Sequence, residues 1–226
     1  MSNPSDLYFA QQMVGDMANL AYLVGSREQR KAFVIDPAWN VQSLIDLAAQ
    51  DGIEVVGALV THYHQDHIGG EIFGHNIEGL AKLMEIAPMP IHVNKHEAEG
   101  VIKISGVSES DLVQHEGGDL LELGGVGVRL IHTPGHTPGS LCFRLKSALV
   151  AGDTLFLQGC GRVDLPGGDS EEMYRTLTQR LSTLPADTVL NPGHAYGGEP
   201  APLSEVRQTN HYLRVPDLAT WRRMMG

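Results

Sequence analysis

The sequence predicts an α/β fold in which a mixed sheet has helices laid against its outside. Strand-like runs alternate with helical patterns along the chain, which is the order expected of such a fold. With 226 residues, 42% of them hydrophobic, the chain can bury a sizeable core. Histidines and aspartates also collect directly after strand-like runs. We therefore expect residues 1–226 to form a single domain with a chemical site at strand ends.

The first part of the chain predicts strands interrupted by one helix. The predicted strands cover residues 7–14, 19–24, 32–35 and 53–60. Asn40 can cap the helix, and apolar residues then recur at helical spacing from Val41 to Ala48. The last of these strands, Ile53 to Val60, is continuously apolar over most of its length, as is typical of a buried strand.

Residues 73–118 are expected to be an inserted segment with its own apolar face. They predict a helix over 77–84, a strand over 91–93 and a helix over 95–103, with a tip at residues 87–90. Long connections in compact domains are usually functional or independently folded. We expect the segment to pack beside the site and form part of its wall; the alternative is that it covers the outside of the sheets.

The second half repeats the order of strands followed by a helix. The predicted strands cover residues 119–123, 126–131, 140–145, 148–150 and 188–190. Residues 170–184 predict a helix that Ser170 can cap, with Glu171 and Glu172 near its positive end. A short helical C-terminal tail follows the last strand.

The charge balance excludes some classes of partner. Sixteen basic residues against 27 acidic ones give a formal net charge of −11. A surface of that sign repels phosphate backbones, so we expect no nucleic acid partner. A small anionic substrate stays compatible, because bound metal ions can reverse the local field.

The chain shows no feature of export or membrane insertion. The first six residues lack the basic and apolar regions of a signal peptide, and no apolar run approaches the roughly 18 residues of a membrane span. Two cysteines, Cys142 and Cys160, are too few for a disulfide framework. These observations predict a cytoplasmic protein without a membrane partner.

The stretch from Thr61 to Gly70 concentrates ligand-type side chains. His62, His64, Asp66 and His67 fall within six positions at the end of a predicted buried strand. Imidazole together with carboxylate suits zinc, iron or manganese better than calcium or magnesium. The alternative is a group of surface histidines around a turn aspartate, but so dense a cluster at a strand end favours a metal site.

Three further ligand-type residues, His136, Asp153 and His194, also follow strand-like runs, although a Pro-Gly-His stretch can be only a turn. We expect one ion to be bound by His62, His64 and His136, and a second by Asp66, His67 and His194, with Asp153 bridging them. Two ions about 3.5–4 Å apart can hold a hydroxide and polarise a carbonyl. The remaining candidates are expected to be structural or exposed: His75, His92, His96 and His115.

These residues resemble the signature of the metallo-β-lactamase fold superfamily. The signature stands here as His62-x-His64-x-Asp66-His67, followed by His136, Asp153 and His194. The resemblance covers nearly the whole chain and implies a four-layer αββα sandwich with the metal site at one edge of the two sheets. It specifies the fold more narrowly than the reaction.

Within the superfamily the sequence is most similar to the glyoxalase II group. The similar stretches are residues 61–70, 133–139, 152–156 and 159–162. This likeness implies a metallo-hydrolase with two zinc ions, iron or manganese being alternatives, that cleaves an acyl thioester such as a hydroxyacylglutathione by a bridging hydroxide. Asp66 would orient the hydroxide as well as bind metal.

Other features leave alternatives open. Glyoxalase II carries a longer helical C-terminal region than this chain has, and Gly161-Arg162-Val163-Asp164-Leu165 also resembles the persulfide dioxygenases, which use one iron. Tyr196 matches a position that touches glutathione in those dioxygenases; a packed aromatic is equally compatible. A phosphodiesterase or nuclease and a β-lactamase are further, weaker alternatives.

Overall fold

Two six-stranded sheets form the centre of the protein, whose computed structural model describes residues 6–225. The first five residues of the chain, part of the stretch tested for a signal peptide, lie outside this range. The first sheet has the order β1 (Leu7–Val14), β2 (Asn19–Ser26), β3 (Lys31–Ile35), β4 (Glu54–Leu59), β7 (Ile91–Asn94) and β8 (Leu112–His115). Its first three strands are antiparallel, and β3, β4, β7 and β8 run parallel. The predicted mixed sheet is therefore present.

The second sheet comes from the other half of the chain. Its order is β14 (Ala201–Pro202), β13 (Val189–Asn191), β12 (Ala148–Val150), β11 (Leu141–Arg144), β10 (Val126–His132) and β9 (Leu120–Leu123). All neighbours are antiparallel except β12 and β13. A separate hairpin joins β5 (Gly70–Ile72) to β6 (His75–Ile77).

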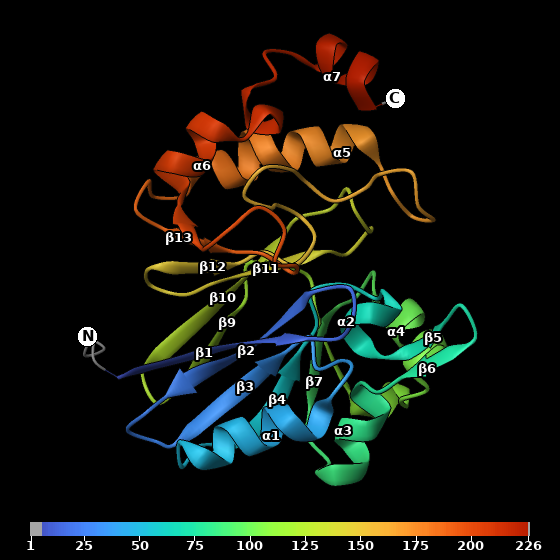
Figure 1. The fold of residues 1–226 in the computed structure, drawn as a ribbon, viewed down its shortest axis with the longest axis vertical. Helices are drawn as coiled ribbons and strands as arrows, with labels where there is room; N and C mark the ends of the chain where they lie inside the picture. Colours follow the sequence, from blue (N-terminus) through green and yellow to red (C-terminus); the bar gives the residue numbers. More distant parts are fainter. Residues whose placement is uncertain (1–5, 226) are drawn as a thin grey trace.

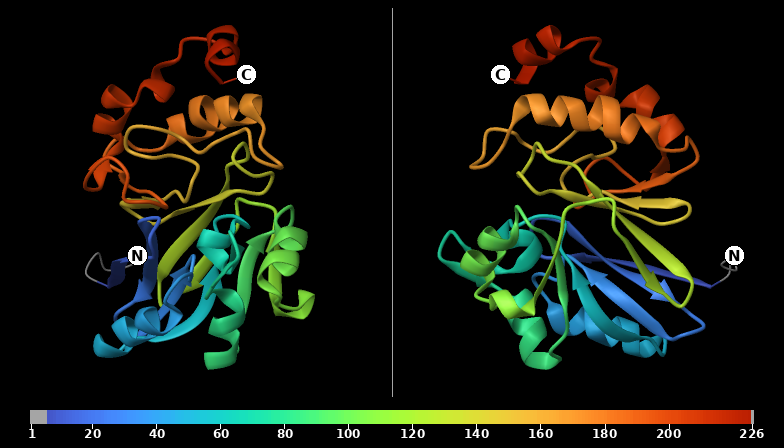
Figure 2. Two further views of the ribbon diagram at one scale, coloured as in Figure 1. Left: turned by 45° about the vertical axis from the view of Figure 1, so that its right-hand side comes forward. Right: turned by 180° about the vertical axis from the view of Figure 1, so that it is seen from behind.

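Helices cover the two outer faces, so that the fold has four layers (Figure 1). Figure 2 shows the same separation from two further sides. The first sheet carries α1 (Val41–Gln50), α2 (Gln65–Ile68), α3 (Leu80–Ile86) and α4 (Ala98–Ser105). The second carries α5 (Ser170–Arg175), α6 (Leu203–Thr209) and α7 (Leu218–Met225). This is the αββα sandwich implied by the sequence resemblance.

Three apolar cores hold the layers together, as the alternation along a strand requires. On β2, Tyr22 and Val24 face the core between the sheets, whereas Ala21 and Leu23 face the helices. The core between the sheets also contains Phe33, Ile35, Leu59, Val128, Leu130, Leu141 and Phe143. The outer core of the second sheet includes Leu149, Leu190, Met173, Leu177, Leu203 and Trp221. A strand shared between two cores is fixed in register, which in turn fixes the positions of the loops at its end.

Local side-chain chemistry explains where the main helices begin. Asn40 caps α1 by accepting a hydrogen bond from the Ser43 backbone N–H at 3.1 Å. The cap of α5 is Asp169 rather than the expected Ser170, because its carboxylate accepts hydrogen bonds from two successive backbone N–H groups. Past α5 the chain continues through a π-helical turn and a 3₁₀ turn to Thr183, so the predicted helix over 170–184 has nearly the right length.

The segment from residue 73 to residue 118 differs most from the sequence prediction. Ile77 lies in β6, and the helix expected from it begins only at Leu80. The helix expected from Lys95 begins at Ala98, after a turn. Strand β8 was not predicted, because its pairing with β7 brings together residues distant in sequence.

The C-terminal tail adds to the second sheet and its outer layer. Strand β14 pairs with β13, and Trp221 of α7 is fully buried with its Nε1–H donating to the Ser170 carbonyl at 2.7 Å. Among residues 6–225, no helix is long and apolar enough to cross a membrane.

Candidate metal centre

The seven predicted ligand residues all lie at one edge of the sandwich, where strands of both sheets end. They come from the turn after β4 and α2 (His62, His64, Asp66, His67), from the loop between β10 and β11 (His136), and from the segments after β12 (Asp153) and β13 (His194). All but His64 and Asp153 are buried, and these two are partly buried. The fold therefore gathers residues that are widely separated along the chain.

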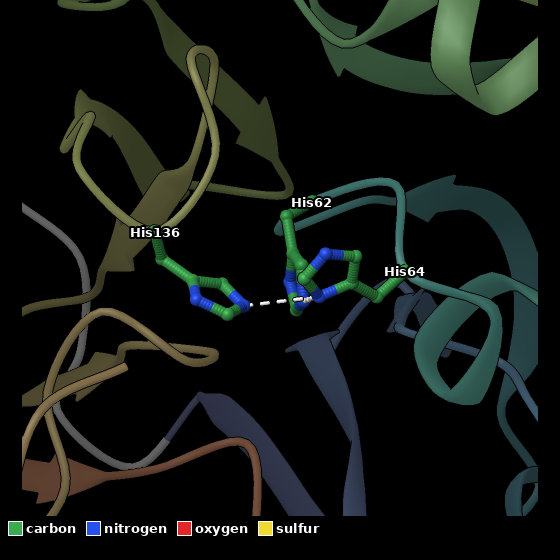
Figure 3. A group of neighbouring side chains, drawn as sticks. All are labelled: His62, His64 and His136. Carbon is green, nitrogen blue, oxygen red and sulfur yellow. Dashed lines mark hydrogen bonds between the residues drawn. The ribbon is translucent and has the colours of Figure 1, made fainter. Parts of the chain in front are cut away.

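Three histidines form the first cluster, which we define as His62, His64 and His136. Their rings point toward one another from the two halves of the sandwich (Figure 3). His64 Nδ1 lies 3.1 Å from His62 Nε2 and 3.0 Å from His136 Nε2. Tetrahedral ligands about 2.0–2.2 Å from a zinc ion lie roughly 3.3–3.6 Å apart, so small shifts would suit this cluster to one ion.

The second cluster consists of Asp66, His67 and His194. The Nε2 atoms of the two histidines are 3.3 Å apart, and Asp66 Oδ2 lies 3.4 Å from the first and 3.3 Å from the second. These separations match the same tetrahedral spacing. Each cluster could thus hold one ion, with two imidazoles and one carboxylate in this one.

Asp153 lies between the two clusters. Its Oδ2 is 3.8 Å from His136 Nε2 and 3.4 Å from His194 Nε2, and its Oδ1 is 3.3 Å from His67 Nε2. Oδ1 is buried yet has no hydrogen-bond partner among the described residues. A buried carboxylate oxygen without a partner is costly, and a cation beside it would remove that cost. The donor set therefore fits a metal centre with Asp153 as its shared ligand.

The outer nitrogens of the histidines are held by oxygen atoms. His62 Nδ1 lies 2.9 Å from Thr61 Oγ1, His136 Nδ1 lies 2.7 Å from the Arg162 carbonyl, and His194 Nδ1 lies 2.9 Å from the Met17 carbonyl. A ring that donates its outer N–H to an oxygen keeps the other nitrogen free for a metal. The surrounding loops thus select the tautomer that a ligand needs.

Close approach of the backbone also shapes the centre. A Cβ atom added at Gly193 would lie 2.5 Å from Asp153 Oδ1 and 3.0 Å from the His67 ring. Only glycine leaves room there for the shared carboxylate.

Burial makes the first cluster a set of neutral bases. It lowers the pKa of His62 well below the ordinary value, and the neighbouring histidines lower it further. Burial and His136 lower the pKa of His64 to about 4. Burial also lowers the pKa of His136. Near pH 7 these imidazoles carry no proton that a metal would have to displace.

Carboxylates give the second cluster the opposite character. Burial alone would lower the pKa of His67, but Asp66 and Asp153 overcome it and raise that pKa well above the ordinary value. Burial likewise opposes charge on His194, yet hydrogen bonds with Asp153 and Asp66 raise its pKa to about 9. Without a metal, this cluster keeps proton-bearing imidazole beside ionised carboxylate.

Sequence reasoning missed several polar residues behind the centre. Asp36, interpreted only as the end of a strand, lies with Oδ2 3.0 Å from His67 Nδ1 and accepts a 2.6 Å hydrogen bond from Thr61 Oγ1. Asn19 Nδ2 donates to Asp66 Oδ2 at 2.9 Å. Asp36 shares with the predicted ligands the signal of an acidic residue directly after a buried strand, which could have identified it.

Glu97 holds the loops behind the first cluster. Its two carboxylate oxygens accept hydrogen bonds from the Tyr63 N–H at 2.8 Å and from the Gly139 N–H at 2.6 Å. These bonds link the turn carrying His62 and His64 to the loop that follows His136. Nothing in the sequence around Glu97 indicates this role, because both contacts are long-range.

Tyr196 lies at the open side of the centre. Its ring stacks on His194 at 4.7 Å, with 6° between the planes, and its hydroxyl donates to the Met17 carbonyl at 3.1 Å. The side chain is 48% exposed, so it is within reach of a bound molecule. Cys160 is largely buried, and burial raises its pKa to about 12, which agrees with a packing role.

The four histidines expected to be structural or exposed stay outside both clusters. His92 and His115 stack on each other with 3.0 Å between Nδ1 and Nε2, and His96 stacks on His132. His75 is exposed in β6.

A cavity of about 530 Å³ opens beside the centre, and His64 and Asp66 line it. From the segment over residues 73–118, Phe73 and Ile104 reach this cavity. The tip at residues 87–90 contributes nothing to the lining, and its Met89 is buried in the outer core of the first sheet. Both expected roles therefore occur in this segment: Phe73 and Ile104 lie at the cavity, and Met89 at the tip packs against the outside of the first sheet.

Comparison with known proteins identifies relatives of the chain. A family model described as the metallo-beta-lactamase superfamily matches residues 14–194. A hydroxyacylglutathione hydrolase from Shewanella halifaxensis is 36% identical over 178 residues, covering 79% of this chain and 62% of that protein. The human mitochondrial persulfide dioxygenase ETHE1 is 33% identical over 180 residues, covering 78% and 64%. This chain thus spans less than two thirds of these two relatives.

Other relatives match over more of their own length. A probable polyketide biosynthesis zinc-dependent hydrolase, BaeB, from Bacillus velezensis is 27% identical over 199 residues, covering 88% of this chain and 83% of that protein. The crystal structure of ETHE1 from Myxococcus xanthus superposes with a TM-score of 0.82 and 26% identity, covering 96% and 89%. Together with the His/Asp clusters, the zinc-dependent relative supports a divalent metal cofactor.

Proposed function

Because the chain belongs to the metallo-beta-lactamase superfamily, we propose that it is a dinuclear metal-dependent hydrolase of acyl thioesters. One observation carries the dinuclear part of this proposal. Two clusters of ligand atoms lie side by side, and Asp153 Oδ2 lies within 4 Å of a histidine from each. Residues of both sheets supply the ligands, so the site forms only in the folded protein.

Two ions at such a site supply an activated water and polarise a carbonyl oxygen. The chain's own groups hold the reacting partners. Asp66 is fixed by the hydrogen bond from Asn19, and the positive neighbours His67 and His194 outweigh burial and keep its pKa low. Asp66 is therefore ionised at neutral pH and can accept a hydrogen bond from the attacking water as well as bind metal.

The choice of a thioester is supported by the hydroxyacylglutathione hydrolase relative and by the likeness of residues 159–162 to that group. In this proposal the ions are zinc, and Tyr196 contacts the substrate at the open side of the centre. The substrate is a small molecule, and a glutathione thioester is one candidate. The two free cysteines, Cys142 and Cys160, support a reducing cytoplasm as the location.

The second candidate is a mononuclear iron persulfide dioxygenase. It is favoured by the human persulfide dioxygenase relative, which matches over 78% of this chain. In this alternative a single ion would be bound through His62, His136 and Asp153 alone.

Metal analysis and an oxygen-controlled assay decide between the two functions. Protein purified without added metal should contain up to two ions per chain and should cleave S-lactoylglutathione or another thioester under anaerobic conditions. One iron per chain, together with oxygen uptake on glutathione persulfide, would replace the hydrolase by the dioxygenase. Glu199→Gln, an exposed change outside both clusters, is the control for purification and metal content.

A further inference from the structure

The cavity beside the metal centre has a predominantly apolar rim that the metal chemistry does not require. Its lining combines residues from the β1–β2 turn, the turn after β4, the β5–β6 hairpin, α4 and the loop before α5: Met17, Tyr63, His64, Gln65, Asp66, Glu71, Ile72, Phe73, Ile104, Leu165 and Pro166. Its volume of about 530 Å³ falls in the range of sites that bind small organic ligands, about 300–1,000 Å³.

Phe73 has no role in the fold that would explain its position. It occupies the tip of the β5–β6 hairpin with 97% of its surface exposed. Phe73 and Gly74 have φ angles of 49° and 81°, the signs of a two-residue type I′ turn. Such a turn favours Asn-Gly, because asparagine adopts positive φ at little cost and an aromatic residue does not. An exposed aromatic ring held in a strained turn at the rim of a cavity indicates contact with a ligand.

The part of the cavity lining formed by Tyr63, Leu165 and Pro166 is held by hydrogen bonds. The Tyr63 hydroxyl donates to the Pro166 carbonyl at 2.6 Å, which attaches the loop carrying Leu165 to the turn between His62 and His64. The Tyr63 N–H is bound in turn by Glu97. The cavity is therefore built onto the same turn that presents two ligands of the first cluster.

The charges of the lining select against an anionic ligand. Its acidic residues are Asp66 and Glu71, and it contains no lysine or arginine. The carboxylates of a peptide thiol such as glutathione would find no cation in this cavity. An uncharged, apolar group is the chemistry that this lining accepts.

We propose that this cavity binds the apolar acyl chain of the thioester substrate and that Phe73 sets the preferred chain length. The proposal rests on the thioesterase function proposed above. Acyl chains that reach from the metal centre to the hairpin bury apolar surface against Phe73, Ile72 and Leu165, whereas an acetyl group is too short to reach them. Selectivity for longer acyl groups follows, while the chemistry at the centre stays the same.

The test compares wild type with Phe73→Asn. This substitution removes the ring and introduces a residue type that the turn favours. Met224→Asn, in α7 on the outer layer, is the matched control because Met224 is another exposed apolar residue, 46% exposed. The substrates are N-acetylcysteamine thioesters from acetyl to octanoyl, which share one uncharged thiol. Metal content and melting temperature are measured for all three proteins.

In wild type and Met224→Asn, kcat/KM should rise roughly 30-fold or more from acetyl to octanoyl, because partial burial of each added methylene favours binding. In Phe73→Asn the rise should fall to about threefold or less, with metal content unchanged. An equal rise in wild type and Phe73→Asn would overturn the proposal.

A binding measurement separates this proposal from the thioesterase function itself. If no thioester is cleaved, the proposed function fails, and calorimetry with S-ethyl and S-octyl thioethers of N-acetylcysteamine then tests the cavity. Tighter binding of the octyl compound to wild type, lost in Phe73→Asn, would support an apolar-chain site. Equal affinities of the two compounds for wild type would refute it.

Discussion

The two clusters of the metal centre are neighbours with opposite electrostatic character. The first contains three imidazoles, and burial with mutual repulsion lowers the pKa values of His62 and His64. The second contains two imidazoles beside carboxylates, which overcome burial and raise the pKa values of His67 and His194. Asp153 lies within 4 Å of a histidine from each.

This difference shows that similar ligand residues can have two different protonation states before a metal ion binds. The first cluster is ready to bind a cation without releasing protons near pH 7. The second has stored negative charge, which attracts a cation, but it holds protons that the cation must displace. Metal binding at the two positions should therefore respond differently to mutation and to pH.

Removing the shared carboxylate should have the largest effect, because it affects both clusters. We expect Asp153→Asn to lower metal content below one ion per chain and to reduce thioester kcat/KM by about 100-fold or more, since loss of even an outer-sphere contact commonly costs 10–100-fold. Elemental analysis and steady-state kinetics measure the two effects. Asp187→Asn, an exposed change, is the control. Retention of two ions by Asp153→Asn would show that no ligand is shared.

Variants that retain one cluster should show the contrast in pH dependence. His64→Ala leaves the second cluster, where His194 has a pKa of about 9. A metal must displace that proton below pH 9, and His67 also carries a proton, so affinity should fall at least about tenfold for each pH unit from 9 down to 7. His194→Ala leaves the first cluster, where His64 has a pKa of about 4, and affinity should be nearly constant over that range.

Competition with a zinc chelator at several pH values measures both affinities. The contrast would be wrong if the two variants showed the same slope of affinity against pH. If the metal affinity of His194→Ala fell between pH 9 and pH 7, the first cluster would carry protons at neutral pH.

Loss of the carboxylate behind His67 should weaken the second cluster more than the first. Asp36→Asn retains the shape of the side chain but removes the charge that orients the His67 ring across 3.0 Å. Affinity at the second cluster should fall about 10–100-fold, and affinity at the first should fall less, because Asp36 reaches His62 only through Thr61. The same chelator competition, carried out in the His64→Ala and His194→Ala backgrounds, measures the metal affinity of each cluster separately. Equal weakening of both clusters would contradict a local role for Asp36.

The ionisation of Glu97, which holds the loops behind the first cluster, should change the free energy of unfolding. Burial raises the pKa of Glu97 to about 7, despite its hydrogen bonds from Gly139, Thr137 and Tyr63, from an ordinary value of 4.5. Between these two pH values the folded state binds more protons than the unfolded state, so the free energy of unfolding should fall as pH rises and then level off above 7. Relative to Glu97→Gln, the metal-free protein should lose roughly 2 kcal/mol across this window.

Urea unfolding of the two proteins at pH values from 4.5 to 8 gives this difference directly. A gap between wild type and Glu97→Gln that stays constant with pH would mean that Glu97 ionises normally. Because the comparison is a difference, titration of the cluster histidines cancels.

The clustered part of the metal centre was the most predictable part of the molecule. His62, His64, Asp66 and His67 are local in sequence and follow a continuous apolar strand, so their placement at a sheet edge follows from a short-range pattern. The meeting of His136, Asp153 and His194 with them required the resemblance to a known family, because no local pattern specifies which strand ends adjoin.

The parts that sequence did not predict depend on long-range pairing or on unusual backbone. Strand β8 forms because Leu112–His115 pairs in parallel with β7. The β5–β6 hairpin was not predicted, and its first strand begins at Gly70, which has a φ of 132°. Asp36 was not among the predicted site residues, and its contacts with Thr61 and His67 are long-range.

The separation of the ligands along the chain makes metal a partner in folding. His64 and His136 are 72 positions apart, and His67 and His194 are 127 apart. An unfolded chain cannot keep such distant donors together, so an ion bound by them stabilises the native state by nearly its full binding free energy. At a metal concentration 1,000 times the dissociation constant, each ion would contribute about 4 kcal/mol, a large part of the 5–15 kcal/mol that separates folded from unfolded domains. The resistance of the protein to proteolysis would then depend on the concentration of free metal ions in its surroundings.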